Sequence, residues 1–506
     1  MFKLIKFEIF RFITVLMFFC IFFSCKGIPE QTTSVNTTNT TPQETLVQER
    51  EKEQVQVSAA AAAEPEPQET AVEAPPEIPV QFDSVFTVTA ANEWTNALTA
   101  ISQGGSGTAN SLKIYAINVN GNFQIPGTKN NIMSFGTADH IKVTLAGSGI
   151  ITLSSSGSII NLRNNQTFII DGENISLRGF GDNDRAVFFI YGGTLELKTG
   201  TISNNFNSYT GLLQSKAGFH GGGVFVGKLG TFNMTGGNVA NNTSYIGGGV
   251  FVDGGTFILS DGKINNNNAA NNGGGVNAAG IFTMSGGIIG NNSSARGGGV
   301  CITGETSFLL KGGSINNNEA FAMGGGVYIN GNKAAFIMED GLIRDNTNIG
   351  SISGGGGVCV SGGSFVLRKG TISGNTNNSI AGGGGVFVYE SASFVMENGN
   401  INGNKSNGRN ARGGGVCVYI NGTFNMLGGV IGGNTASSGG GGLCISDGTF
   451  MKTGGIIYGN NERTNSNTSG SGEGHAVFGN NWDGSTRRNA TVGSNINYYS
   501  HNFWEN

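Results

Sequence analysis

One short sequence unit recurs nine times over residues 221–460, and this repetition limits the possible fold more than any other feature. Each copy opens with GGGV, or GGGL in the ninth copy, passes through a phenylalanine and ends on an apolar-x-x-Asn motif. The distance from phenylalanine to asparagine is always ten residues, whereas the repeat length varies from 24 to 31. A fixed block within a variable period predicts a solenoid, in which coils stack and insertions stay in the loops.

The unit also predicts its own secondary structure. Its apolar residues alternate, as Val224 and Val226 and then Phe232 and Met234 do in the first copy. Alternation over short runs bounded by glycine and asparagine is typical of strands. We therefore expect an all-β fold, a parallel β-helix solenoid with three strands per coil, in which 221–460 forms nine regular coils. Because parallel crossover connections are nearly always right-handed, we expect the right-handed form.

Two columns of side chains should point into this solenoid. The phenylalanines are expected to stack in the core, and the asparagines to form a ladder in which each amide bonds the next amide and the local backbone. The expected core stack consists of Phe232, Phe257, Phe282, Phe308, Phe336, Phe365, Phe394, Phe424 and Phe450. The expected ladder consists of Asn205, Asn242, Asn267, Asn292, Asn318, Asn346, Asn375, Asn404, Asn434 and Asn460. Its first member comes from a degenerate copy that carries Leu195 in place of the phenylalanine.

The first 25 residues have the pattern of an export signal. Three basic residues precede an apolar run over 13–23, which is followed by Ser24 and Cys25. A small residue before a cysteine at this point resembles a lipobox, so 1–25 is predicted to be a lipoprotein signal peptide with Cys25 as the lipidated residue. Phe22 stands where a lipobox usually has leucine. A plain secretory signal or an uncleaved anchor is the alternative interpretation.

Residues 26–80 are predicted to be a disordered tether. They hold seven of the eight prolines, ten acidic and three basic residues, and too little apolar surface to fold. The remaining body carries 23 basic and 22 acidic residues, a net charge of +1. This balance does not favour a nucleic-acid partner, and no motif in the chain predicts a cofactor.

The solenoid should have a cap at each end, because exposed strand edges pair readily with other chains. Residues 81–220 are expected to hold the N-terminal cap, a short amphipathic helix over 91–101, and degenerate coils. The expected strands lie at 111–119, 140–145, 149–153, 158–162 and 167–170. Residues 461–506 are expected to form a last degenerate coil, with a strand at 474–478, and a C-terminal cap. The tail aromatics belong to this cap or form a platform for stacking carbohydrate; they are Trp482, Tyr498, Tyr499, Phe503 and Trp504.

Residues that carry chemistry are sparse. Cysteines directly follow the glycine-rich tetrad in four copies and alternate away from the core, at Cys301, Cys359, Cys417 and Cys444. The last two fall on adjacent coils, about 4.8 Å apart, which suits either a disulfide or two small stacked residues. Asp182 and Asp184 are interpreted as a solvated turn or a Ca²⁺ loop. The four histidines have no ligand spacing, so no metal site is predicted.

The turn after each ladder asparagine is the part of the repeat that changes. The next glycine triplet begins from five to nine residues after the asparagine. The widest turns are predicted to line one edge of a rod, as binding loops or as slack linkers, at 347–354, 376–382 and 405–412. The third of these is basic, and its candidate binding residues are Lys405, Arg409 and Arg412.

The repeat resembles that of a known family. GGGV followed by apolar-x-x-Asn is similar to the GGA[ILV] and FxxN repeats of polymorphic outer-membrane-protein adhesins. More broadly, the chain resembles the pectin-lyase-like, right-handed β-helix lipoproteins of bacterial surfaces. The similarity is strong over 185–480 and weaker over 85–185. It departs from the adhesins in carrying a lipid signal.

The resemblance implies attachment to host or neighbouring cells. We therefore expect a non-enzymatic lipoprotein of the bacterial cell envelope, held at the outer membrane by its lipid and exposed at the surface. Its role would be adhesion or a structural coat, with a surface protein or glycan as partner. A carbohydrate-active β-helix lyase or hydrolase, which needs carboxylates gathered on one face, is one alternative, and a periplasmic scaffold is another. Fold alone does not choose among them, and the sequence does not place such carboxylates together.

Overall fold

In a computed structural model, the structure describes residues 80–129, 132–207, 220–460, 465–471, 474–480 and 503–504. All of these residues belong to one unit of the chain, Ile78–Asn506. The predicted signal peptide with Cys25, the tether up to residue 79, and Trp482, Tyr498 and Tyr499 lie outside the described residues.

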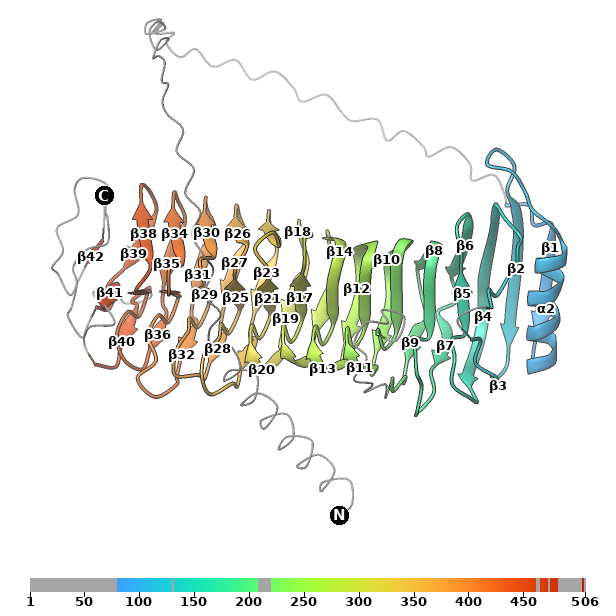
Figure 1. Ribbon diagram of the computed structural model, residues 1–506, viewed down its shortest axis with the longest axis horizontal. Coiled ribbons are helices and arrows are strands. Elements are labelled where there is room, and N and C mark those ends of the chain that lie inside the picture. Colours follow the sequence, from blue (N-terminus) through green and yellow to red (C-terminus); the bar gives the residue numbers. More distant parts are fainter. Residues whose placement is uncertain are drawn as a thin grey trace, which may run out of the picture. The chain divides into compact units, whose positions relative to one another are not determined.

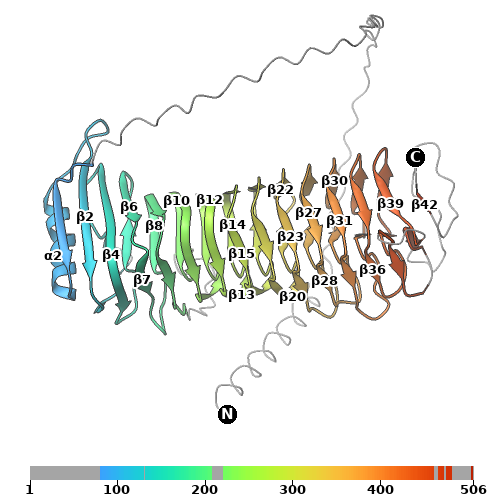
Figure 2. The same cartoon turned by 180° about the vertical axis from the view of Figure 1, so that it is seen from behind.

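This unit is a parallel β-solenoid of about 13 turns, which confirms the predicted fold class (Figure 1). Nearly every strand pairs in parallel with its counterpart one coil further along the chain. The coils therefore follow one another in chain order, from α2 (Ala91–Gln103) at one end to the coil of β41 (Val477–Asn480) near the other, as both views show (Figures 1 and 2).

Three strands of each regular coil enclose the core. The first follows the glycine triplet, the second contains the core phenylalanine, and the third ends just before the ladder asparagine. First strands are β17 (Val300–Thr303), β21 (Val327–Asn330), β25 (Val358–Ser361), β29 (Val386–Tyr389), β33 (Val416–Tyr419) and β37 (Leu443–Ser446). Second strands are β18 (Ser307–Leu310), β22 (Ala335–Met338), β26 (Ser364–Leu367), β30 (Ser393–Met396), β34 (Thr423–Met426) and β38 (Thr449–Lys452). Third strands are β15 (Ile288–Gly290), β19 (Ser314–Asn316), β23 (Leu342–Arg344), β27 (Thr371–Ser373), β31 (Asn400–Asn402), β35 (Val430–Gly432) and β39 (Ile456–Tyr458).

A further short strand follows each ladder asparagine and belongs to a separate nine-stranded sheet. Its members are β11 (Thr243–Ile246), β13 (Asn268–Asn272), β16 (Ser293–Arg296), β20 (Glu319–Met323), β24 (Thr347–Asn348), β28 (Thr376–Asn377), β32 (Lys405–Ser406), β36 (Thr435–Ala436) and β40 (Thr468–Ser469). In the earlier regular coils the core strands run together into longer ones, β10 (Val224–Ala240), β12 (Val250–Asn265) and β14 (Val276–Met284).

The N-terminal coils follow the same path with less regular strands. They comprise β1 (Ser84–Val88), β2 (Lys113–Asn120), β3 (Phe123–Ile125), β4 (Ile141–Leu153), β5 (Ile160–Leu162), β6 (Gln166–Ile170), β7 (Asn174–Arg178), β8 (Phe188–Leu197) and β9 (Thr201–Ser203). The strands predicted at 140–145 and 149–153 are one continuous strand, β4. Gly147 and Gly149 bend it through positive φ angles of 93° and 144°, so the chain turns without leaving the sheet.

The helix α2 covers the first coil, as predicted. Its buried side chains are Trp94, Ala97 and Ile101, and Trp94 lies against Phe123 with ring centroids 6.4 Å apart. The Glu93 carboxylate accepts hydrogen bonds from the N–H and the hydroxyl of Thr89, at 2.6 and 2.8 Å, and so anchors the start of the helix. At the opposite end, β42 (Phe503–Trp504) pairs antiparallel with β39.

The phenylalanines form the expected stack in the core. All nine are fully buried and pair in register between successive second strands, and Phe232 pairs with Leu195 of the degenerate copy. Ring centroids of neighbours lie between 4.4 Å, for Phe282 and Phe308, and 5.1 Å, for Phe424 and Phe450. The rings are nearly parallel along most of the stack, so each one packs its faces against two others.

The asparagine ladder is also present and uses the full bonding capacity of its amides. The Nδ2 of Asn292 donates to Ile264 O at 2.9 Å and to Asn318 Oδ1 at 3.0 Å. Its Oδ1 accepts from the backbone N–H and the Nδ2 of Asn267, at 2.9 and 3.1 Å. The same four bonds recur from Asn267 to Asn434, so every amide in this part of the ladder is buried without an unsatisfied atom.

A sharp turn places each asparagine. The preceding residue has φ between 53° and 67° in the left-handed region; these residues are Asn204, Asn241, Asn266, Asn291, Asn317, Asp345, Gly374, Gly403 and Gly433. Asparagine, aspartate and glycine tolerate that conformation best, which explains why each ladder residue from Asn205 to Asn434 follows one of them. The turn points the amide inward toward the third glycine of a triplet. A Cβ added at Gly299 would lie 2.9 Å from Asn318 Nδ2 and 2.7 Å from Gly326 O, so only glycine fits there.

The prediction for Asn460 is wrong, because Asn467 occupies the last ladder position. Asn467 is fully buried, and its Oδ1 accepts from Asn434 N and Nδ2 at 2.9 and 3.0 Å, whereas Asn460 is exposed. The cause is an insertion after β39. The Asn467 N–H donates to Gly459 O at 3.0 Å and closes the inserted loop at its base, so the ladder continues seven residues later than the spacing predicts (467 against 460).

We expect Asn292→Ala to lower the free energy of unfolding by about 1–3 kcal/mol, because the substitution leaves Asn267 and the Ile264 carbonyl without buried partners. Chemical unfolding of the two proteins measures the difference. The matched control is Asn291→Gly, at an exposed neighbour with φ 56°, which should change stability by at most about 0.5 kcal/mol. Equal stability of the Asn292 variant and the wild type would contradict the ladder's role.

Candidate binding edge

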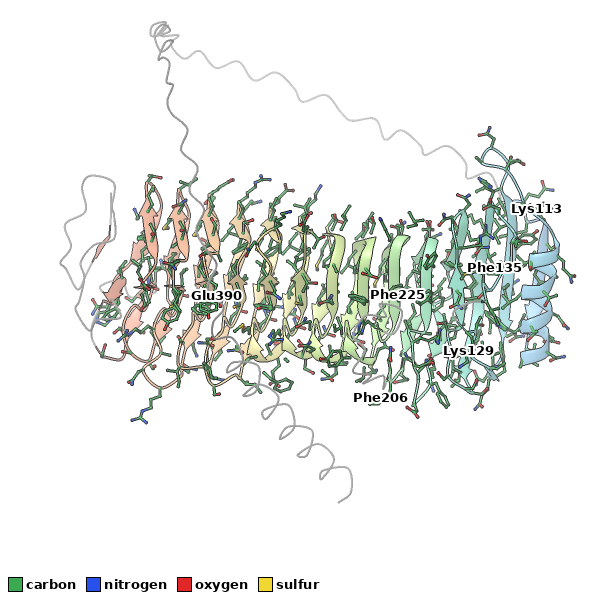
Figure 3. The ribbon with its side chains drawn as sticks, in the orientation of Figure 1. Lys113, Lys129, Phe135, Phe206, Phe225 and Glu390 are labelled. Atoms are coloured by element: carbon green, nitrogen blue, oxygen red, sulfur yellow. The ribbon has the colours of Figure 1, made fainter. Side chains whose placement is uncertain are left out.

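The segments between each ladder asparagine and the next glycine triplet lie along one side of the solenoid, which we call the loop edge. It carries the nine-stranded sheet from β11 to β40. In Figure 1 these strands follow the lower side of the solenoid, and Phe206, which bridges Thr243 of β11, lies on the same side in Figure 3. Because the Phe-to-Asn block never changes length, differences between coils are concentrated at this edge.

The wide loops at 347–354 and 376–382 are bound to each other, so they are not slack linkers. Ile380 N–H donates to Ser351 O at 3.2 Å, and Ala381 N–H donates to Ile352 O at 3.1 Å. Within the second loop the Ser379 hydroxyl is fully buried and donates to Ala381 O at 2.8 Å. These bonds hold the two loop tips side by side.

The loop tips present apolar side chains to solvent. Ile352 is 71% exposed and Ile380 is 59% exposed, the first of these being the largest exposure among the large apolar side chains described. Phe321, in β20 of the preceding coil, is 40% exposed. On the next coil Lys405 and Arg409 are exposed. Three adjacent coils thus each carry an exposed apolar side chain, and the next coil carries two exposed cations.

Arg412 does not belong to this exposed surface. Its guanidinium lies 4.6 Å from the centroid of the Phe478 ring, and the side chain is only partly exposed. The stacking of a cation on an aromatic face stabilises this inward position. The binding role of Lys405, Arg409 and Arg412 stays a prediction, and the structure distinguishes the two exposed residues from Arg412, which packs on Phe478.

Beneath the loop edge lies a second, smaller apolar cluster, which we call the satellite core. It consists of Cys301, Tyr328, Cys359, Phe387, Cys417, Cys444 and Phe478. These side chains alternate away from the main core, as expected, but the returning loops bury them. Burial raises the pKa of the Cys301 thiol to about 12, so the group stays protonated at neutral pH. All four cysteines of this cluster are free in the structure.

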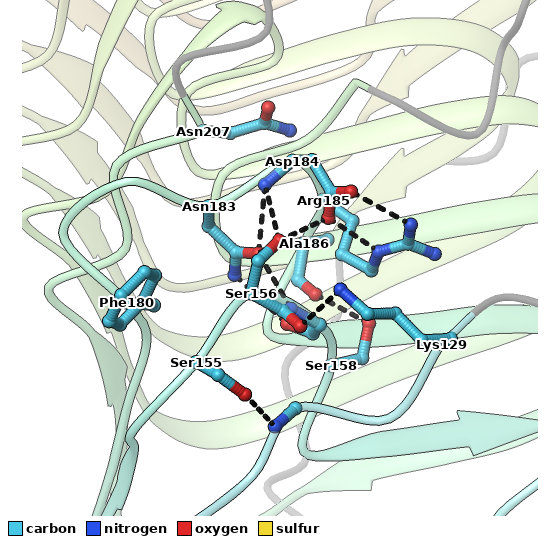
Figure 4. Close-up of polar contacts among 12 residues, drawn as sticks. Lys129, Ser155, Ser156, Ser158, Phe180, Asn183, Asp184, Arg185, Ala186 and Asn207 are labelled. Atoms are coloured by element: carbon cyan, nitrogen blue, oxygen red, sulfur yellow. Dashed lines mark hydrogen bonds and ion pairs between the residues drawn. The ribbon is translucent and has the colours of Figure 1, made fainter.

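A polar cluster joins the N-terminal coils at Asp184 (Figure 4). The Asp184 carboxylate accepts from Arg185 Nε at 2.8 Å and from the Ser156 hydroxyl at 2.6 Å. Asn183, which is buried beside it, donates from Nδ2 to Asn205 Oδ1 at 2.8 Å and so extends the ladder by one coil. Arg185 is bound to Asp184 and nearly buried, whereas Asp182 is exposed and 39% of the Asp184 side chain is exposed, so the predicted turn is solvated only in part.

The sequence reasoning missed a row of charges in the turns after three successive second strands. Arg368 lies 3.0 Å from Glu339 and 3.6 Å from Glu397, and Lys369 lies 2.8 Å from Asp340. The sequence could have predicted this row, since acidic and basic residues occupy the same place in consecutive copies of the repeat. The Lys369 ammonium is the main cause that holds the pKa of Asp340 below its usual value. A general acid requires the opposite shift, so the row is built as cross-coil ion pairs.

Among the described residues, no three His, Cys, Asp or Glu side chains gather in a way that could hold a metal ion. One shallow, open hollow is lined in part by Lys311, Asp340 and Leu342, beside the charged row. Within the described ranges, no helix has both the length and the apolar character to cross a membrane.

Comparisons with known proteins give no further guide to the site. No protein-family model, no curated protein and no solved structure matches the chain.

We expect Asp184→Asn to lower the free energy of unfolding at pH 7 by roughly 1 kcal/mol. The effect is modest because 39% of the Asp184 side chain is exposed, so that solvent screens its ion pair with Arg185. Arg185, hydrogen-bonded to Asp184, lowers the pKa of this carboxyl from 3.8 to about 2. A lowered pKa stabilises the fold above the unfolded value, and this contribution is lost as pH falls through the folded value. The difference from the wild type should therefore shrink between about pH 4 and pH 2.

The control is Asp171→Asn, which removes an exposed ion pair with Lys198 and should change stability little at pH 7. Unfolding curves of the three proteins across this pH range measure both effects. A difference for Asp184→Asn that stays constant down to pH 2 would contradict the assignment.

Proposed function

We propose that this protein is a non-enzymatic, lipid-anchored cell-envelope protein, displayed at the surface, whose solenoid presents the loop edge to a protein or glycan on another cell. The observation that carries the proposal is the succession of exposed side chains on neighbouring coils, Phe321, Ile352 and Ile380, followed by Lys405 and Arg409 on the next coil. Large exposed apolar patches bordered by polar groups typically mark interaction sites. The predicted lipidation at Cys25 and the predicted tether would place this edge away from the membrane.

The invariant Phe-to-Asn block and the variable loop edge differ in their capacity to bind a partner, and this difference supports the proposal. From Asn267 to Asn434 the ladder amides are saturated by one another and by backbone carbonyls, so they have no capacity left for a ligand. The loop edge differs from coil to coil, yet its tips are held by backbone bonds. A variable surface on a rigid scaffold is where recognition usually evolves, because a preformed site loses little entropy on binding.

The alternatives make different demands. A carbohydrate-active enzyme could use the hollow beside the charged row, but the carboxylate of Asp340 is engaged by Lys369 and has a lowered pKa, which does not suit a general acid. A periplasmic scaffold would have the same fold and anchor. Protease treatment of intact cells separates it from the surface protein, since only a surface-displayed solenoid can be removed by this treatment.

We expect palmitate to label the wild-type chain and not the Cys25→Ala variant, because the thiol of Cys25 is the predicted acceptor of the lipid. The observation behind this expectation is Ser24-Cys25 at the end of an apolar run. Metabolic labelling of cells that express each full-length chain measures it. The control is Cys20→Ala, which should be labelled as the wild type is. Equal labelling of the Cys25 variant and the wild type would reject lipidation at Cys25.

We expect Ile352→Ser, Ile380→Ser and Arg409→Ser, combined, to reduce adhesion strongly without lowering the melting temperature. Burying one isoleucine against a partner contributes about 1.5–3 kcal/mol, which is roughly tenfold or more in affinity. Adhesion of cells that display the full-length chain to epithelial monolayers and to immobilised glycans measures the effect.

The matched control is Leu229→Ser, Ile281→Ser and Leu427→Ser, which removes comparably exposed apolar side chains outside the loop edge. These substitutions should leave adhesion unchanged. If the loop-edge variant adheres as well as the wild type, or if the control loses as much adhesion, the loop edge is not the binding surface.

A further inference from the structure

The satellite core holds two thiols in direct register. Cys417 of β33 pairs with Cys444 of β37, and the strands on either side of these residues keep the same register. Adjacent parallel strands lie about 4.8 Å apart, within the range of about 4.4–6.8 Å between the Cα atoms of a disulfide. Their side chains leave the same face of the sheet and belong to the same apolar cluster.

The geometry points to Cys417 and Cys444 as the site of an intramolecular disulfide that covalently links the last two regular coils. No movement of the backbone is needed, because the stacking of the coils already sets the distance. Both residues are nearly completely buried within the apolar satellite core. A disulfide satisfies both sulfur atoms within the same space.

The other two cysteines of this column cannot pair in the same way. Tyr328 lies in register between Cys301 and Cys359, so two coil steps, about 9.6 Å, separate those Cα atoms. Phe387 separates Cys359 from Cys417 in the same manner. The stacking therefore selects one pair out of the four cysteines and provides two buried thiols as internal controls.

The reaction needs an external disulfide as oxidant, for which oxidised glutathione serves as the example. One cysteine thiolate attacks it, forms a mixed disulfide and releases one glutathione thiol. The second cysteine then attacks the protein sulfur of the mixed disulfide, and the second glutathione thiol leaves. Two electrons pass from the cysteines to the glutathione, and the two protons of the cysteine thiols end on the released thiols.

Burial determines when this bond can form. The hydrogen bond to Cys444, together with burial, raises the pKa of the Cys417 thiol, which suppresses the thiolate that exchange requires. The bond should therefore form while the chain folds, before the loop carrying Arg412 closes over the cluster. Once formed, it should resist reductants until the solenoid unfolds. The disulfide would also hold in place the strand that directly follows the loop with Lys405 and Arg409.

The experiment maps the thiols of the full-length chain after refolding in a buffer of reduced and oxidised glutathione, so it does not depend on export. The protein is then denatured in excess N-ethylmaleimide without reductant and digested with trypsin. Residues 413–452 contain no lysine or arginine before Lys452, so Cys417 and Cys444 fall in one peptide. A disulfide leaves this peptide unalkylated and two hydrogen atoms lighter than the dithiol.

We expect the 413–452 peptide to carry the disulfide and no alkyl group, and Cys301 and Cys359 each to be alkylated in their own peptides. In Cys417→Ser, Cys444 should become alkylated. Dithiothreitol should lower the melting temperature of the refolded wild type by several degrees and leave that of Cys417→Ala/Cys444→Ala unchanged. Two alkyl groups on the 413–452 peptide of the wild type would overturn the inference, as would a disulfide at Cys301 or Cys359.

Discussion

The contact between the asparagine ladder and the glycine column is the interaction on which the rest of this solenoid depends. Each ladder amide fills its four hydrogen bonds only if the next coil stacks directly above it. That stacking requires the third glycine of each triplet, because a Cβ at Gly299 would meet the amide of Asn318 at 2.9 Å. A buried amide without its partners would cost more than an apolar residue, so the ladder fixes the register of every coil. The phenylalanine stack then follows in that register.

This constraint divides the molecule into a part that cannot vary and a part that can. The ten residues from phenylalanine to asparagine are bound on both sides by neighbouring coils, so an insertion there would break the ladder and the stack together. The segment after the asparagine contributes no side chain to the ladder or to the phenylalanine stack. It accepts insertions, and where these are longest the structure places exposed Ile352 and Ile380 next to each other. The proposed binding surface, the loop edge, thus lies where the ladder permits insertions.

The errors of the sequence reasoning have a common physical origin. Spacing alone placed Asn460 in the ladder, but the chain tolerates an extra loop there as long as some asparagine, here Asn467, returns to the column. Composition alone made Arg412 part of a basic surface, but its long side chain turns back onto the apolar ring of Phe478. Both outcomes depend on what lies one or two coils away, and neither is visible in the local sequence.

The sequence by itself determined the class of fold, the strand order, the phenylalanine stack and most of the ladder, because a repeat that buries the same residues in every coil encodes its contacts by position. It also located the variable loops. Only the tertiary structure decided which loop residues are exposed, that the four cysteines lie in a satellite core, and that Glu339, Arg368 and Glu397 form one row. These features arise between coils that are 24 to 31 residues apart, where the folding back of loops and the size of stacked neighbours determine each contact.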